Sequence, residues 1–154
     1  MDFVNNDIFL DGYAKLEAVV NHLSNNVKTK ISPSSIHGIG VFAIRDIKCG
    51  ENLFPNWEYE TGIYVIPNEL VETLPNFSKQ LLDMYFINQE CGYKILRLFK
   101  GQNFLYHGLS FCNSAYPFPE KVNISTSGIA VKDIKAGEEI LEWYTENINL
   151  VNSK

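Results

Sequence analysis

Two glycines that flank a single isoleucine form the first pattern in this chain that could bind a ligand. Gly38 and Gly40 bracket Ile39 in the segment SSIHGIGVFA, immediately before a run of strand-forming residues. Glycines let a ligand approach the backbone closely, and exposed backbone N–H groups can bind a carboxylate. No third glycine opens a helix after them, so the pattern is not a dinucleotide-binding fingerprint. A ligand-binding turn and a simple turn are both consistent with these residues.

Two asparagines carry the second pattern, in the segment LSFCNSAYPFPEKVNI. An apolar run leads into Asn113, and Asn123 enters the next run after a loop marked by prolines. A carboxamide both donates and accepts hydrogen bonds, which suits a polar heterocycle or a clamped backbone. The alternative for each asparagine is an Asx-turn within its own loop.

An aromatic pair, Trp143 and Tyr144, closes the last predicted strand. Aromatic faces can hold cations and the alkyl stem of a lysine. Aromatic pairs more commonly pack in a core or at its rim, so the pair alone does not indicate a site.

A short phrase occurs twice, as DIKCGE from Asp46 and as DIKAGE from Asp133, 87 residues apart. In each copy a strand ends before the aspartate, the phrase turns, and another strand begins at the glutamate. Gly50 and Gly137 occupy the position where such a turn needs positive φ. Two similar corners of one fold are the simplest interpretation.

The elements that position these residues begin with a helix over residues 7–23, where apolar residues recur at steps of four and three. Those residues are Phe9, Tyr13, Leu16, Val20 and Leu23. We expect this stripe to pack on the main domain, and a dimer seam is the alternative. Residues 1–27 therefore form an N-terminal helical extension.

From residue 28 onward, short β-rich runs alternate with Gly, Pro and Asn. The runs are GVFAI, NLFPNWEYE, GIYVI, YKILRLF, NFLYHGLSF, NISTSGIAV and EILEWY. A helical insert at about 67–87 interrupts them, and Pro75 splits it into two pieces. The pattern predicts a β-dominated α+β domain over residues 28–147, followed by a tail at 148–154.

Taken together, the order and spacing of these motifs resemble the SET-domain family of S-adenosylmethionine-dependent protein lysine methyltransferases. The early signature is HGIGVFAIRDIKCGENLF, and the late signature is FCNSAYPFPEKVN followed by DIKAGEEILEWY. The resemblance covers about residues 30–146. It implies a β-clip fold of several small sheets with a threaded, pseudoknot-like C-terminal segment, an exception to the usual unthreaded connectivity.

The resemblance also implies roles for individual residues. Tyr144 is the implied catalytic residue, and the reaction moves a methyl group from S-adenosyl-L-methionine to the side-chain amine of lysine, leaving S-adenosyl-L-homocysteine. The implied cofactor-binding residues are His37, Gly38, Ile39, Gly40, Asn113 and Ser114. The candidate walls of the lysine channel are Tyr106, Tyr116, Trp143 and Trp57.

Departures from the family pattern keep other functions open. Ser114 replaces the histidine after the asparagine, Ala115 the next serine, Val122 a proline, Trp143 an acid and Ser110 an arginine. One alternative is a catalytically inactive SET-like module that binds cofactor, peptide or a partner protein. Another is a β-clip assembly domain unrelated to the family.

Composition limits the remaining function classes. The chain has 154 residues, a net charge of -5 and three scattered cysteines. This charge argues against nucleic-acid binding and suits a basic partner. The resemblance implies that this partner is a lysine-containing protein or peptide substrate. No ligand pair for zinc is present, and Cys112 with His107 would lie on opposite faces of a regular strand. We expect no metal.

The first residues and the lengths of the apolar runs bear on the expected cellular location. Acidic residues occur early, no basic region opens the chain, and no apolar run approaches 18 residues, which argues against secretion by a signal peptide and against a membrane span. The expected location is the cytoplasm, or the nucleus or a host cell for a viral or effector protein. The sequence is compatible with a homodimer.

Overall fold

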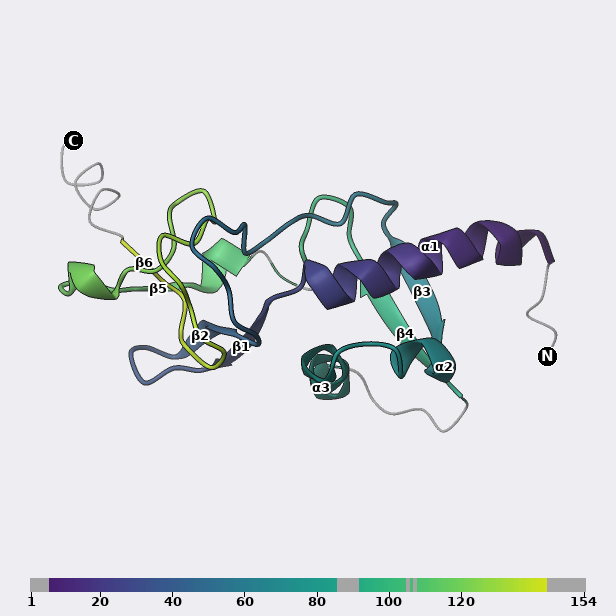
Figure 1. Cartoon of the computed structure of the whole chain (residues 1–154), viewed down its shortest axis with the longest axis horizontal. Helices are drawn as coiled ribbons and strands as arrows, with labels where there is room; N and C mark the ends of the chain where they lie inside the picture. The colour runs from purple at the N-terminus through teal and green to yellow at the C-terminus, as the bar shows by residue number, and fades with distance from the viewer. Residues whose placement is uncertain (1–5, 86–91, 105, 107, 144–154) are drawn as a thin grey trace. The chain divides into compact units, whose positions relative to one another are not determined.

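The structure, a computed structural model, describes residues 6–85, 92–104, 106 and 108–143, with side chains of the first helix from residue 15 onward. The chain divides into two compact units, each made of two stretches of sequence. The first unit comprises Met1–Val27 and Asn56–Leu105, and the second comprises Lys28–Pro55 and Tyr106–Lys154. Figure 1 labels the elements of each unit. The predicted boundaries at 27/28 and 147/148 stay predictions.

The described residues of the first unit form three helices and one antiparallel strand pair. Helix α1 (Asn6–Asn25) confirms the predicted first helix, although it begins one residue before Asp7, its expected cap. Helices α2 (Asn68–Val71) and α3 (Asn76–Tyr85) confirm a helical stretch split at Pro75. Strands β3 (Gly62–Pro67) and β4 (Tyr93–Leu98) pair in the register Gly62 to Leu98.

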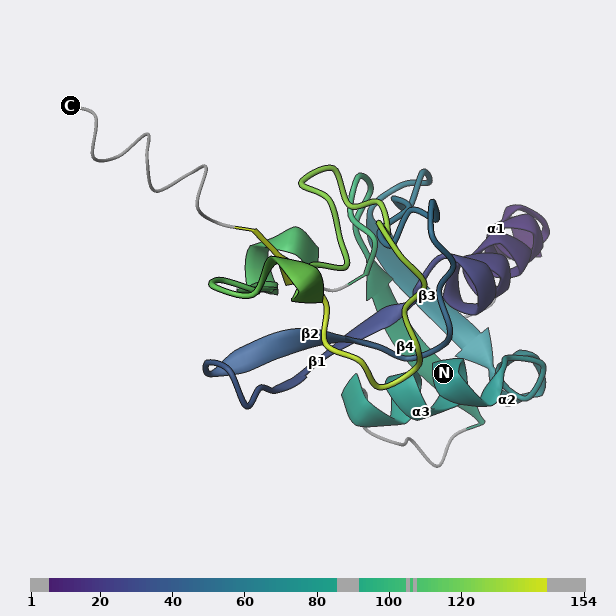
Figure 2. The same ribbon diagram turned by 60° about the vertical axis from the view of Figure 1, so that its left-hand side comes forward.

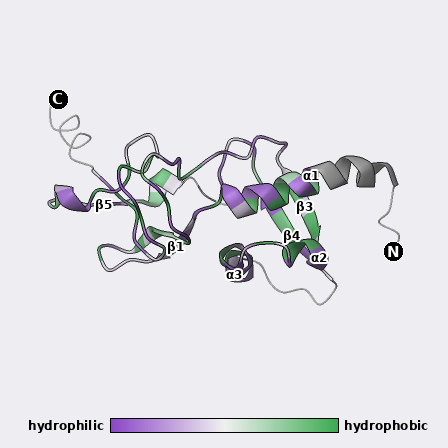
Figure 3. Ribbon diagram, viewed as in Figure 1, coloured by the Kyte–Doolittle hydropathy of each residue, from purple (hydrophilic) through white to green (hydrophobic). Residues whose placement is uncertain are grey.

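Alternation along β3 and β4 determines which side chains form the core of the first unit. Tyr64 and Ile66 on β3 are buried, as are Leu96 and Leu98 on β4, whereas the side chains between them are more exposed. This is the period of two expected for a sheet with one buried face. Figure 3 shows the apolar character of both strands beside the mixed character of α1.

The buried stripe of α1 differs in part from the predicted one. Leu23 is buried as expected, but its described neighbours in the core are Val19 and His22, while Val20 is only half-buried. Ser78 of α3 donates to the carbonyl oxygen of Leu23 at 2.6 Å, which satisfies a free carbonyl at the end of α1.

The second unit is built from short strands and turns. Strands β1 (Thr29–Pro33) and β2 (Ile39–Ala43) form an antiparallel hairpin, which Figure 2 shows extending to the loop that joins them. Strand β5 (Asn113–Ser114) pairs in parallel with β6 (Leu141–Glu142). Two short 3₁₀ helices, η1 (Gly108–Phe111) and η2 (Pro119–Lys121), complete the described elements.

The last described segment is bonded on both of its sides. Ile140 donates its backbone N–H to the carbonyl oxygen of Val41 on β2 at 2.7 Å. One residue later β6 pairs with β5, so this segment joins β2 to β5. The threading that the family resemblance implies stays a prediction.

The two copies of the repeated phrase pair with each other. Ile47 and Ile134 exchange both backbone hydrogen bonds, each at 2.8 Å. Two further bonds of 2.8 Å match each other, Gly50 N to Ala130 O and Gly137 N to Ala43 O. Both glycines have φ of +90°, as expected for the turns. The two corners therefore form a local pseudo-two-fold arrangement.

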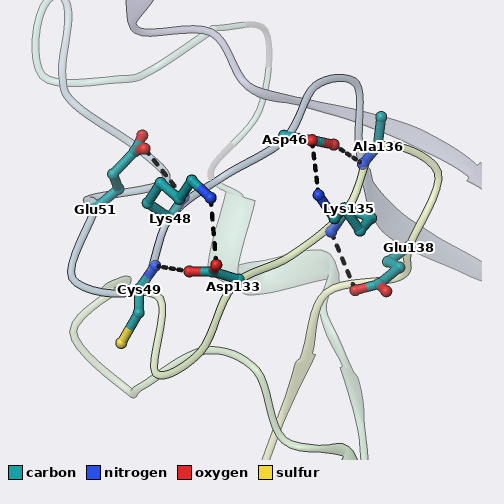
Figure 4. A network of polar contacts seen from close by, with 8 residues as sticks. All are labelled: Asp46, Lys48, Cys49, Glu51, Asp133, Lys135, Ala136 and Glu138. Atoms are coloured by element: carbon teal, nitrogen blue, oxygen red, sulfur yellow. Dashed lines mark hydrogen bonds and ion pairs between the residues drawn. The ribbon is translucent and has the colours of Figure 1, made fainter.

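Side chains of the phrase repeat the same symmetry (Figure 4). Asp46 accepts from the backbone N–H of Ala136 at 3.0 Å and pairs with Lys135 at 3.0 Å. The matching contacts of Asp133 are to Cys49 N at 2.9 Å and Lys48 Nζ at 3.3 Å. Each aspartate thus caps the turn of the opposite copy.

The core of the second unit includes residues of both corners. Its buried members are Val41, Ala43, Ile47, Leu53, Cys112, Ile124, Ala130, Ile134 and Ile140. Several come in pairs from equivalent positions of the two copies, such as Ile47 with Ile134 and Leu53 with Ile140. The repeated phrase therefore builds the core as well as the corners.

The β-rich α+β class predicted from sequence is confirmed, with several differences in the elements. Strand β1 was not predicted, and the end of the expected strand NFLYHGLSF is the 3₁₀ helix η1. The expected strand NLFPNWEYE contributes only an isolated bridge at Asn52. Within the described part of the chain, no helix is long and apolar enough to cross a membrane.

Candidate functional site

The Gly-x-Gly turn forms the tip of the β1–β2 hairpin. Ser34 N donates to the Gly38 carbonyl at 2.9 Å, and the Ser34 hydroxyl accepts from Ile36 N at 3.0 Å. Gly38 has φ of +49°, a left-handed conformation that favours glycine. These hydrogen bonds close the turn and leave His37 and Ile39 exposed.

Asn113 brings the second sequence pattern to the first. Its Nδ2 atom donates to the carbonyl oxygen of Ile39 at 3.0 Å and lies 3.2 Å from that of His37. Asn113 opens β5 near the start of the second unit's second stretch. The structure thus joins the predicted asparagine to the predicted glycine turn.

Glu139 and Ser34 complete this cluster, and the sequence did not single out either one. Asn113 Nδ2 lies 2.8 Å from Glu139 Oε1, its shortest contact. The Ser34 hydroxyl lies 2.8 Å from Oε1 and 2.9 Å from Oε2, so its one hydrogen is shared between the two oxygens. The available signal was the second repeated phrase, which has Glu139 where the first has Asn52.

Gly40 gives the cluster its close packing. A Cβ atom at this position would lie 2.1 Å from Glu139 Oε1 and 3.1 Å from Asn113 Nδ2. The second glycine is therefore required because side chains, rather than a ligand alone, approach the backbone here.

Acceptors exceed donors in this cluster, which we call the Asn113–Glu139 cradle, formed by Ser34, His37, Ile39, Asn113 and Glu139. Three acceptor oxygens surround Asn113 Nδ2, which carries only two hydrogens. Within the described residues no cationic side chain pairs with Glu139. Such a cradle can accept hydrogen bonds from a ligand amine, and its formal charge favours a cation.

An aromatic surface lies at the other end of the β5–β6 pair. The rings of Tyr116 and Trp143 have centroids 5.6 Å apart, and Tyr116 is 64% exposed. Ser114 accepts from the Tyr116 backbone N–H at 3.1 Å, so its hydroxyl shapes this turn. Two predicted channel residues are therefore brought together beside a predicted cofactor residue.

The other two predicted channel residues in the described part of the chain have contacts of their own. Tyr106 is bonded to the Thr29 hydroxyl at 3.2 Å and contacts Phe111 edge-on. Trp57 belongs to the first unit, where it is 2% exposed and donates to the carbonyl of Glu60 at 3.2 Å. Tyr144, the predicted catalytic residue, lies outside the described residues.

Asn123 clamps the backbone of the segment that carries Glu139. Its side chain donates to the Glu139 carbonyl at 2.8 Å and accepts from Leu141 N at 2.8 Å. The residue is buried, so both ends of its carboxamide serve the fold. Of the uses foreseen for Asn123, the structure matches the backbone clamp.

The surroundings of Cys112 disfavour its thiolate form. Burial, followed by the nearby charges of Glu142 and Glu139, raises the pKa of its thiol to about 12. Its sulfur contacts the Gly108 carbonyl at 3.5 Å, and His107 lies outside the described residues. No group of three or more metal-ligating side chains occurs in the part of the chain that is described.

Two of the solved structures that match this chain show how low the similarity is. No protein-family model and no curated protein matches the chain. A Plasmodium falciparum protein named as a candidate histone methyltransferase is 23% identical, over 77% of this chain and 93% of that one, with a TM-score of 0.35. A humanized mutant of the Chaetomium thermophilum Polycomb Repressive Complex 2, bound to an inhibitor, is 21% identical over 80% of this chain and 15% of that one, also with a TM-score of 0.35. At this TM-score neither likeness establishes a function for the chain.

Proposed function

We propose that the second unit binds S-adenosyl-L-methionine at the Asn113–Glu139 cradle and transfers its methyl group to the side-chain amine of lysine in a protein. The observation that carries this proposal is the contact between Asn113 Nδ2 and the Ile39 carbonyl at 3.0 Å. It joins the two sequence motifs on which the SET-domain resemblance depends.

The residues present suit such a cofactor in two ways. The absence of a side chain at Gly40 lets Glu139 and Asn113 approach the glycine turn, and the cradle they form has acceptor capacity for the protonated α-amine of an amino acid. When bound, the cofactor supplies an electrophilic methyl group on a positively charged sulfur. The proposed binding residues are His37, Gly38, Ile39, Gly40, Asn113 and Ser114.

In this reaction the protein contributes mainly by aligning the reacting atoms, and acid–base catalysis is less important. The lone pair of a neutral lysine amine forms the new N–C bond as the S–C bond breaks, and the electron pair leaves with S-adenosyl-L-homocysteine. The methylated amine then loses its proton to solvent. Holding the reacting atoms in line removes much of the entropic barrier.

A lysine must reach the site without its proton. Its ordinary pKa is about 10.4, and burial in an apolar channel lowers the pKa of an amine. We assign Tyr144 to the reacting amine and Tyr106, Tyr116 and Trp143, all of the second unit, to the channel walls. The acidity of the chain suits a basic protein segment as substrate.

A cofactor-binding module without catalysis is the second candidate. It is favoured by Ser114, whose hydroxyl is engaged with the Tyr116 backbone at 3.1 Å where the family pattern has a histidine. Methyl transfer to protein lysines separates the two candidates.

Calorimetric titration of the purified chain with S-adenosylmethionine tests the cradle. We expect one saturable site, weakened about tenfold by Asn113→Ala because hydrogen bonds of the cradle are lost. Asn21→Ala, an exposed asparagine of α1, is the matched control and should bind like wild type. Absence of binding by wild type at millimolar cofactor would refute the proposal.

Transfer is then measured with labelled cofactor and a mixture of basic proteins. Wild type should label lysines, and Tyr144→Phe should reduce labelling at least tenfold while binding cofactor normally. Binding without any labelling would favour the inactive module, and equal labelling by both chains would remove Tyr144 from the catalytic role.

A further inference from the structure

The orientation of the Asn113 carboxamide is determined by its surroundings. The two ends of a carboxamide have nearly the same shape, so hydrogen bonds decide which end faces which neighbour. Around Nδ2 lie Glu139 Oε1 at 2.8 Å, the Ile39 carbonyl at 3.0 Å and the His37 carbonyl at 3.2 Å. All three neighbours are acceptors.

The opposite orientation would place three acceptors against a fourth. Oδ1 would then face the Glu139 carboxylate and two carbonyl oxygens, with no hydrogen between any of them. The contact with Glu139 is the shortest of the three and the only one to an ionised group, and charge-assisted hydrogen bonds are about twice as strong as neutral ones. Glu139 therefore contributes most to the preference.

Glu139 is itself fixed before any ligand arrives. Ser34 donates to its carboxylate at 2.8 and 2.9 Å, and Asn123 holds its backbone carbonyl at 2.8 Å. The next residue, Ile140, is bonded to β2 at 2.7 Å. Glu139 is thus held both through its carboxylate and through its backbone.

We propose that Glu139, supported by Ser34, is a positioning residue that acts through Asn113. It holds Nδ2 toward the glycine turn and leaves Oδ1, which has no partner among the described residues, as the acceptor available to a donor on the ligand. This role rests on the proposed function, because the ligand is taken to be S-adenosylmethionine.

Two substitutions at Glu139 separate hydrogen bonding from charge. Glu139→Ala removes the acceptor and should weaken cofactor binding about tenfold, whereas Glu139→Gln keeps an oxygen for Asn113 and should lose only about threefold. Ser34→Ala should fall between wild type and Glu139→Ala. Glu138→Gln makes the same charge change one residue earlier, at a carboxylate that contacts Lys135 N at 3.3 Å, and should bind like wild type.

A second readout needs no ligand. The side-chain amide signals of Asn113, identified by their loss in Asn113→Ala, report on this contact in nuclear magnetic resonance spectra. In Glu139→Ala we expect both signals to shift and their hydrogen exchange to accelerate about tenfold. In Glu138→Gln neither should change.

The two readouts distinguish failure of the inference from failure of the proposed function. Unchanged amide signals in Glu139→Ala, or equal cofactor binding by Glu139→Ala and Glu139→Gln, would overturn the positioning role. Shifted amide signals together with no cofactor binding by wild type would support the contact and overturn the proposed function instead.

Discussion

At the scale of single residues, the site depends on Gly40 as much as on the polar groups around it. We expect Gly40→Ala to displace the Glu139 carboxylate, because the new Cβ would lie 2.1 Å from its Oε1 atom. Cofactor binding should weaken at least tenfold, and overpacking should lower the free energy of unfolding by about 1–3 kcal/mol. Calorimetry and urea denaturation measure the two effects.

Gly62→Ala is the matched control for this prediction. It adds the same methyl group on β3, where the nearest atom, in the Tyr64 ring, would be 3.9 Å away. Binding by this variant should be unchanged. A Gly40→Ala chain that binds cofactor as well as Gly62→Ala would show that the close packing around Gly40 is not needed.

The cradle also shows what residue-level sequence reasoning finds and misses. Gly38, Gly40 and Asn113 were predicted because their types imply close approach and two-way hydrogen bonding. Ser34 and Glu139 were missed, because a serine in a loop and a glutamate at the start of a predicted strand carry no such signal. Their role comes from a contact across the fold, between Ser34 and Glu139 at 2.8 Å.

At the scale of elements, the two copies of the repeated phrase make matching contacts at their aspartates and differ at their glutamates. Glu51 accepts from Lys48 N at 3.0 Å and also pairs with the buried ammonium of Lys28 at 3.2 Å. Among the described residues, its equivalent Glu138 accepts a hydrogen bond within its own turn, from Lys135 N, and forms no ion pair like that of Glu51 with Lys28. The first corner therefore carries a buried charge that depends on its glutamate.

Glu51→Gln should consequently cost more than Glu138→Gln. The first change leaves the Lys28 ammonium without its carboxylate, and we expect the free energy of unfolding to fall by about 1–3 kcal/mol. The second change should cost less than about 0.5 kcal/mol, as for most exposed positions. Equal losses in urea denaturation would contradict the asymmetry.

The sequence predicted where several helices and turns occur better than it predicted which segments pair with each other. The first helix follows from its apolar period, and the break between α2 and α3 follows from Pro75, since both are local effects. The phrase was correctly interpreted as two corners, but nothing local states that Ile47 pairs with Ile134. Strand β1 was missed because TKISP alternates weakly and draws its stability from β2.

At the scale of the whole molecule, the two units should respond to acid at different pH. In the first unit, burial lowers the pKa of His22, and the hydrogen bond to the Asn103 carbonyl at 2.5 Å only partly opposes this. Because a carbonyl only accepts, His22 Nε2 carries the proton. Its Nδ1 then accepts from Asn26 Nδ2 at 3.2 Å, and a second proton would break this contact.

In the second unit, the pKa values of three carboxyl groups are lowered. Backbone hydrogen bonds are the main cause, from Ala136 to Asp46, from Lys48 to Glu51 and from Cys49 to Asp133. A lowered pKa means that the folded state stays ionised when the unfolded state takes up protons. These groups stabilise the fold above their ordinary pKa of about 4, and that stability is lost as the pH falls below it.

Acidification should therefore weaken the first unit before the second. The unfolded chain protonates His22 near its ordinary pKa of about 6.5 while the folded chain resists, so stability falls as the pH decreases from there. Amide hydrogen exchange can be followed by mass spectrometry and compared with the intrinsic exchange rate at each pH. Peptides from 15–27 and 56–85 should be less protected at pH 5.5 than at pH 7.5. Peptides from 28–55 and 108–143 should follow only below about pH 4.

His22→Gln provides the control, because glutamine keeps an N–H donor for the Asn103 carbonyl but does not titrate. In this variant the change between pH 7.5 and 5.5 should disappear, while the change below about pH 4 remains. If the change between pH 7.5 and 5.5 persisted in this variant, a titratable group other than His22 would be its cause. Simultaneous loss of protection in both stretches at pH 5.5 would mean that the two units open as one.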